Sequence, residues 1–185
     1  MIMKKKLLSI LLVLPMIMTF FASSLTTYAS GYEINNIHSQ AVSLSVGSNF
    51  IKVGDTSIHT DHPAFIDPGT NAVMIPAGIV ALLLGIPQNQ ITWGDGGIMT
   101  IVNGGRTIQF IICSDQLIVN GVNDTMYSTD GLPVRAVIFE NELFAPSRYV
   151  ALALGVDYEW EVSTQTVIFN SKDWTNTPIS YRNKC

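Results

Sequence analysis

The stretch that decides the fold occurs twice in this chain. Residues 73–86 read VMIPAGIVALLLGI, and residues 143–156 read LFAPSRYVALALGV. Each copy has the pattern of an apolar strand end, a proline that opens a helix, one short apolar helix, and a closing glycine. Proline suits the first helical turn because the N–H that it lacks has no partner there, and glycine past the last turn accepts a positive φ angle. We therefore predict two strand–helix units, with structural residues Pro76 and Gly85 in the first and Pro146 and Gly155 in the second.

The two copies stay in step beyond the helices. Trp93 and Trp160 follow the first and second helix, and residues 50–54 align with residues 117–121. We predict an internal repeat of about residues 50–112 and 117–170. Stacked repeats need about three or more copies to bury a continuous core, so we expect these two copies to complete one shared fold.

Strand signals dominate the rest of the chain. Residues 42–46 alternate apolar and polar side chains, which is the period of a half-buried strand. The pairs Asn103-Gly104 and Glu140-Asn141 separate apolar runs and indicate hairpin turns. The predicted fold class is α+β: a twisted, mostly antiparallel sheet packed on two short helices, built from two copies of a strand–helix–strand unit.

The N-terminal residues have the pattern of an export signal. Three lysines, residues 4–6, precede an uncharged run over residues 7–21, and small residues lead to Ala29. We predict a signal peptide over residues 1–29, with an uncleaved membrane anchor as the alternative. Then follow an N-terminal segment (30–44), the domain (45–170) and a polar tail (171–185). The predicted location is secreted or on the cell surface, with membrane contact only through the signal before cleavage.

Charge and cysteine content limit the partners. The formal net charge is −4, and it becomes −7 without residues 1–29, which carry three lysines and no acid. A field of that sign repels nucleic acid, so no nucleic-acid partner is expected. The two cysteines, Cys113 and Cys185, have three options after export: an intramolecular disulfide, free thiols, or an intermolecular bond.

One motif resembles a known family. Residues 146–160 read PSRYVALALGVDYEW and are followed by STQTVI at 163–168. This pattern and its second copy resemble the copper amine oxidase N-terminal-like domain, also called the stalk domain, over about residues 45–170. The resemblance implies an α+β module of secreted and surface proteins of Gram-positive bacteria. The family takes its name from a non-catalytic stalk, so the resemblance implies no enzymatic activity, copper or other cofactor. Gly78 departs from the family's arginine, which leaves Arg148 as the candidate for any binding role of that arginine.

Three side chains are candidates for binding. Arg148 lies one turn into the second helix, where it binds a ligand or forms a buried ion pair with Glu142, Asp157 or Glu159. Trp93 and Trp160 have the aromatic surface that stacks on sugars, but their matched positions also favour a place in the core.

The segment His59-Thr60-Asp61-His62 raises a second class of function. Two imidazoles and a carboxylate are ligands that copper or zinc accepts, so His59, Asp61 and His62 form the metal-site hypothesis. The alternative is a solvated loop in which Asp61 makes a turn. For catalysis, Ser147 and Cys113 have no histidine or acid beside them in sequence, so no nucleophilic site is predicted.

These observations lead to two functional predictions. The first is a secreted, non-catalytic surface module that mediates binding or spacing at the bacterial cell envelope. Its partner is then a cell-wall polymer or another envelope protein. The second is an extracellular copper- or zinc-binding protein that uses the histidine loop.

Overall fold

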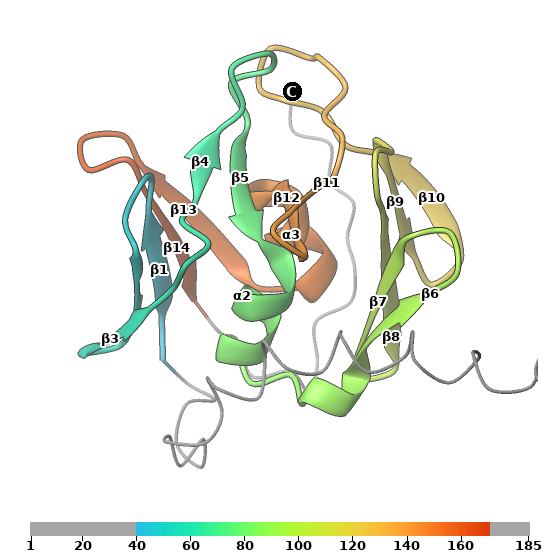
Figure 1. Cartoon of the computed structure of the whole chain (residues 1–185), viewed down its shortest axis with the longest axis horizontal. Coiled ribbons are helices and arrows are strands. Elements are labelled where there is room, and N and C mark those ends of the chain that lie inside the picture. Colours follow the sequence, from blue (N-terminus) through green and yellow to red (C-terminus); the bar gives the residue numbers. More distant parts are fainter. Residues whose placement is uncertain (1–39, 171–185) are drawn as a thin grey trace, which may run out of the picture. The chain divides into compact units, whose positions relative to one another are not determined.

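The computed structural model describes residues 40–170 (Figure 1). The predicted signal peptide, residues 30–39 and the polar tail lie outside this range, so the predictions for them are not addressed by the structure. Among the described residues, no helix is long and apolar enough to cross a membrane. The elements, in chain order, are β1 (Val42–Ser45), β2 (Phe50–Val53), β3 (Thr56–His59), β4 (Phe65–Ile66), β5 (Val73–Pro76), α2 (Ala77–Leu83), the 3-10 helix η2 (Gln88–Gln90), β6 (Ile91–Gly94), β7 (Ile98–Asn103), β8 (Arg106–Ile111), β9 (Gln116–Val119), β10 (Val122–Thr125), β11 (Val137–Phe139), β12 (Glu142–Pro146), α3 (Ser147–Leu154), β13 (Asp157–Glu161) and β14 (Thr166–Asn170).

The strands form three sheets. Sheet A has the order β13-β14-β1-β2-β3, sheet B the order β11-β12-β5-β4, and sheet C the order β10-β9-β8-β7-β6. All neighbouring strands are antiparallel. The α+β class with mostly antiparallel sheets and two short helices is confirmed, but the prediction of a single sheet is wrong. Helices α2 and α3 each follow a strand of sheet B. The strand after α2 belongs to sheet C, and the strand after α3 belongs to sheet A.

Sheet B carries both helices at the ends of its central strands. β5 pairs with β12, with Ile75 opposite Ala145, and each strand passes directly into its helix. Pro76 and Pro146 end the strands and precede the helices, with φ angles of −70° and −59°. The prolines therefore stand one position earlier than predicted. Their fixed φ fits this extended position as well as the first helical turn.

The two helices end in the same way, and the predicted glycines are confirmed there. Gly85 has a φ of 92° and Gly155 a φ of 73°, angles that side-chain-bearing residues rarely adopt. The residue after each glycine donates its N–H to the carbonyl five positions earlier, at 3.0 and 3.1 Å. This arrangement pairs helix-end carbonyls that would otherwise lack donors.

One hydrophobic core joins the helices to the two large sheets. In Figure 1, α2 and α3 lie between sheet A on the left and sheet C on the right. Fully buried side chains come from sheet A, from both helices and from sheet C, and they include Val42, Leu44, Val80, Val150, Ile101 and Phe110. Each large sheet therefore has one face on the core and one face toward solvent.

Both predicted hairpins are confirmed, and the first turn lies one residue later than the predicted pair Asn103-Gly104. Gly104 and Gly105 join β7 to β8, and Glu140 and Asn141 join β11 to β12. All four residues have positive φ angles, as tight two-residue hairpin turns require.

The chain enters and leaves the described domain on neighbouring strands. β1 pairs with β14, and Val42 lies opposite Phe169. Since the pair is antiparallel, the start of β1 lies beside the end of β14. β1 begins within the segment predicted to precede the domain, and it occupies the centre of sheet A.

Candidate functional site

The three predicted binding residues do not form one site. Trp93 stands on β6 in sheet C and is 43% exposed, whereas Trp160 stands on β13 in sheet A and packs against the core. Arg148 is exposed on α3, so it does not form the buried ion pair considered above. The core interpretation therefore fits Trp160 and not Trp93. A ligand-binding role for any of the three stays a prediction.

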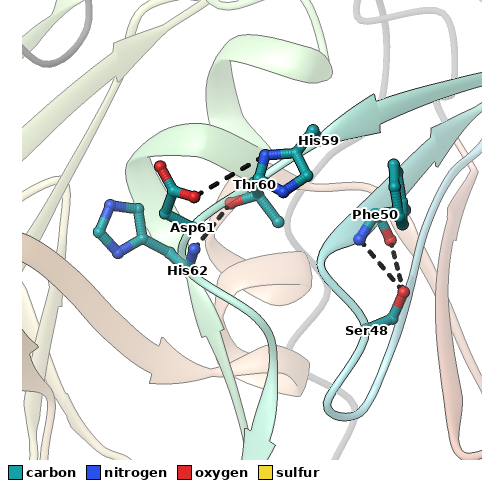
Figure 2. A network of polar contacts seen from close by, with 6 residues as sticks. All are labelled: Ser48, Phe50, His59, Thr60, Asp61 and His62. Atoms are coloured by element: carbon teal, nitrogen blue, oxygen red, sulfur yellow. Dashed lines mark hydrogen bonds and ion pairs between the residues drawn. The ribbon is translucent and has the colours of Figure 1, made fainter.

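The histidine loop makes a turn (Figure 2). The N–H of His62 donates to Thr60 Oγ1 at 3.0 Å, and Thr60 is buried. His59 Nδ1 lies 3.8 Å from Asp61 Oδ1, and both side chains are more than half exposed. Figure 2 shows the ring of His62 pointing away from His59 and Asp61.

The ring of His62 instead packs against Phe144. The two rings meet edge to face with their centroids 6.4 Å apart, and the His62 Nδ1 atom is buried without a hydrogen-bond partner among the described residues. No cluster of three histidine, cysteine, aspartate or glutamate side chains within residues 40–170 has the geometry of a metal site. The predicted three-ligand set is therefore not assembled in this structure.

A largely buried carboxyl group, that of Glu142, lies at the start of helix α2, where the sequence interpretation placed no site. The N–H groups of Gly78 and Ile79 donate to the Glu142 carboxylate, and burial raises the pKa of Glu142 to about 7. A β-carbon on Gly78 would lie 3.1 Å from Glu142 Oε1. The missing side chain of Gly78 thus leaves space for the carboxylate. The sequence signal was Gly78, which stands where the second copy has Arg148.

The C-terminal end of helix α3 contacts a cation. Arg106, the first residue of β8, donates from Nη1 to the Ala153 carbonyl oxygen at 3.2 Å, in the last turn of α3. A positive charge at a helix C-terminus is favourable because the carbonyl dipoles point there. No role was assigned to Arg106 in the sequence analysis, since pairing between distant segments is not visible in local spacing.

The two candidate nucleophiles have structural surroundings. Ser147 is buried, and its hydroxyl lies 3.2 Å from the Tyr158 hydroxyl. Cys113 is exposed in the turn after β8, and its N–H donates to the Ala136 carbonyl oxygen at 2.8 Å. Cys185, the other cysteine, lies outside the described residues.

These observations define a small α+β domain in which residues 40–170 assemble no metal site and the Ser147 hydroxyl lies beside Tyr158. A family model, Copper amine oxidase N-terminal domain, matches residues 52–169. The chain belongs to this family, which is the non-catalytic part of copper amine oxidases. No curated protein and no solved structure matches the chain.

Proposed function

We propose that this chain is an exported, non-catalytic domain that binds a component of the bacterial cell envelope. The family is a non-catalytic one, and residues 1–29 have the three-part pattern of an export signal. The partner is a cell-wall polymer or another envelope protein.

The position of the two ends of the described domain favours binding over spacing. Val42 lies opposite Phe169 in an antiparallel pair, so the chain enters and leaves sheet A at the same end. Adjacent strands lie about 5 Å apart. A spacer has to separate the segments on its two sides, and this domain brings them together. The domain is therefore better suited to present its surfaces to a partner than to hold two segments apart.

The charge of the surface argues against nucleic acid as the partner. Residues 40–170 carry four basic side chains, Lys52, Arg106, Arg135 and Arg148, among a larger number of acidic ones. One of the four, Arg106, is engaged with the end of α3. The remaining cations are too few for a basic stripe along a phosphate backbone.

Co-sedimentation with purified Gram-positive cell walls tests this proposal. The chain from residue 30 is mixed with washed walls at about 0.1 and 1 M salt, and a parallel tube contains EDTA. We expect saturable pelleting that EDTA does not change. Pelleting that EDTA abolishes would indicate that a bound metal mediates the contact, with His59 and Asp61 as candidate ligands. A chain that stays in the supernatant at both salt concentrations would contradict the proposal.

A further inference from the structure

The outward face of sheet C carries no charged side chain. Successive residues of a strand point to opposite faces, so the residues that alternate with the buried ones along each strand occupy the outward positions. In sheet C the buried rows pass through Met99, Phe110 and Leu117 and through Ile101, Ile108 and Val119. The residues that alternate with these buried ones are all half-buried or exposed. They are Thr92, Gly94, Ile98, Thr100, Val102, Thr107, Gln109, Ile111, Gln116, Ile118, Asn123 and Thr125. We call this set the uncharged face.

Sheet A provides an internal comparison. It also has five antiparallel strands with one face on the same core. Its outward positions include charged and titratable side chains, namely Lys52, His59, Asp157, Glu159 and Glu161. A five-stranded sheet in this domain therefore accepts charges on its solvent side. The lack of charge on sheet C is a property of that surface and is not required by the fold.

The uncharged face carries both hydrogen-bond donors and hydrogen-bond acceptors. Gln109 Nε2 donates to Thr100 Oγ1 at 3.3 Å, and Gln116 Nε2 donates to Thr125 Oγ1 at 3.2 Å. The Gln109 amide keeps a second N–H, the oxygens of both glutamine amides can accept, and the threonine hydroxyls can donate. Asp115 borders the face, and its Oδ1 accepts a hydrogen bond from Gln116 Nε2 at 3.1 Å.

Aliphatic side chains lie between these polar groups. Ile98, Ile111 and Ile118 are half-buried and do not belong to the hydrophobic core, and Val102 is 39% exposed. The surface thus has hydroxyl or amide groups on all five strands, with aliphatic C–H surface between them on β7, β8 and β9. This is the pattern of groups that a sugar polymer presents, with hydroxyls at the ring edges and C–H groups on the ring faces.

We propose that the uncharged face binds a neutral polysaccharide. This inference rests on the proposed function and names the chemical class of its partner. An anionic polymer would find no cation on this face and would approach a chain of net negative charge. A second copy of the chain fits less well, because sheets that pack face to face interdigitate mainly apolar side chains. The rows of threonine and glutamine on this face match a hydroxylated, uncharged partner.

Two matched charge substitutions test the proposal. Gln109→Glu keeps the shape of the side chain and places one charge at the centre of the uncharged face, on β8 between Thr100 and Ile118. Ser43→Glu is the control, because Ser43 is half-buried at the centre of the outward face of sheet A, on β1 between Ile168 and Lys52. Thermal melts of both variants verify that each one folds. Thr100→Glu replaces Gln109→Glu if that variant does not fold.

Binding is measured on insoluble chitin, cellulose and β-1,3-glucan, and on a teichoic acid coupled to beads. The native chain should bind at least one neutral polymer with little dependence on salt, and it should not bind the teichoic acid. Gln109→Glu should weaken that binding about tenfold or more, because the new charge loses water at the contact. Ser43→Glu should change the binding by less than about twofold, since exposed charges away from a contact have small effects.

The outcomes separate this inference from the proposed function. If the native chain pellets with cell walls but binds no neutral polymer, the polysaccharide inference is wrong and envelope binding stands. Equal losses in Gln109→Glu and Ser43→Glu would also overturn it, since the contact would not be specific to sheet C. Sedimentation velocity provides a further check. A dimer of the native chain that Gln109→Glu dissociates would replace the polysaccharide with a second copy as the occupant.

Discussion

The guanidinium group of Arg106 occupies the space in which a side chain on Gly155 would begin. A β-carbon on Gly155 would lie 2.5 Å from Arg106 Nη1, the same atom that donates to the Ala153 carbonyl oxygen. Gly155 also has a φ of 73°. The backbone angle selects glycine at this position, and a β-carbon there would also displace the end of the Arg106 side chain.

The first prediction concerns Gly155→Ala. The positive φ alone should cost about 1 to 2 kcal/mol of unfolding free energy. Displacement of Arg106 should add about 1 kcal/mol, because it weakens a charged hydrogen bond to the helix end. Urea denaturation measures the total loss of unfolding free energy. The control is Gly121→Ala, since Gly121 has a φ of 78° with no atom within 4 Å of the new β-carbon. Equal losses in the two variants would show that the Arg106 contact has no role.

Arg106→Met should destabilise the domain by about 1 kcal/mol. It removes the cation and donor at the end of α3 and keeps most of the aliphatic side chain. The double variant Arg106→Met, Gly155→Ala should lose less stability than the sum of the single losses, since both changes break the same hydrogen bond. A double-mutant cycle in urea measures this coupling. Strict additivity would contradict the contact.

Stability should depend on pH through Glu142. Burial raises the pKa of Glu142 from 4.5 to about 7 in the folded state. The protonated form therefore favours folding, so this contribution is complete below pH 4.5 and is lost as the pH rises toward 7. The upper limit of the loss is about 3 kcal/mol, from 1.36 kcal/mol per unit of pKa.

Glu142→Gln provides the comparison for that pH dependence. Its neutral amide oxygen still accepts from the backbone N–H groups at the start of α2, and it does not titrate. Denaturation midpoints of both proteins are measured between pH 4 and 8. The stability of Glu142→Gln relative to the native chain should increase over this range. A constant difference would show that the Glu142 carboxyl is not destabilised by burial.

The two tryptophans should differ in their contribution to stability. Trp160 packs against the core, so Trp160→Ala should cost about 2 kcal/mol or more. Trp93 is 43% exposed, and Trp93→Ala should cost clearly less. Thermal unfolding with tryptophan fluorescence and circular dichroism measures both. A larger loss at Trp93 would contradict the assignment.

Local sequence patterns predicted the local structure well. The closing glycines of both helices and the hairpin turn at Glu140-Asn141 were visible because positive φ angles restrict the residue types. The division into three sheets was not visible. It depends on which distant strands pair, and the pairing of β1 with β14 joins residues more than 120 positions apart.

The candidate site was predicted less well. Residue type marked His59, Asp61 and His62 as metal ligands, but the turn made by Thr60 directs His62 toward Phe144. The contacts of Glu142 with α2 and of Arg106 with α3 depend on tertiary packing, which local spacing does not contain. The uncharged face became visible only when strand register placed its residues on one side of sheet C.

The most direct test of envelope binding through sheet C is a map of the contact by amide NMR. Spectra of the labelled chain from residue 30 are recorded while the neutral oligosaccharide of the best-bound polymer is added. We predict that the shifted resonances lie in β6 to β10, with the largest changes near Thr100, Gln109 and Ile118, and that resonances of sheet A stay in place. Shifts concentrated in sheet A or around Arg148, or no shifts at a saturating concentration, would contradict the account.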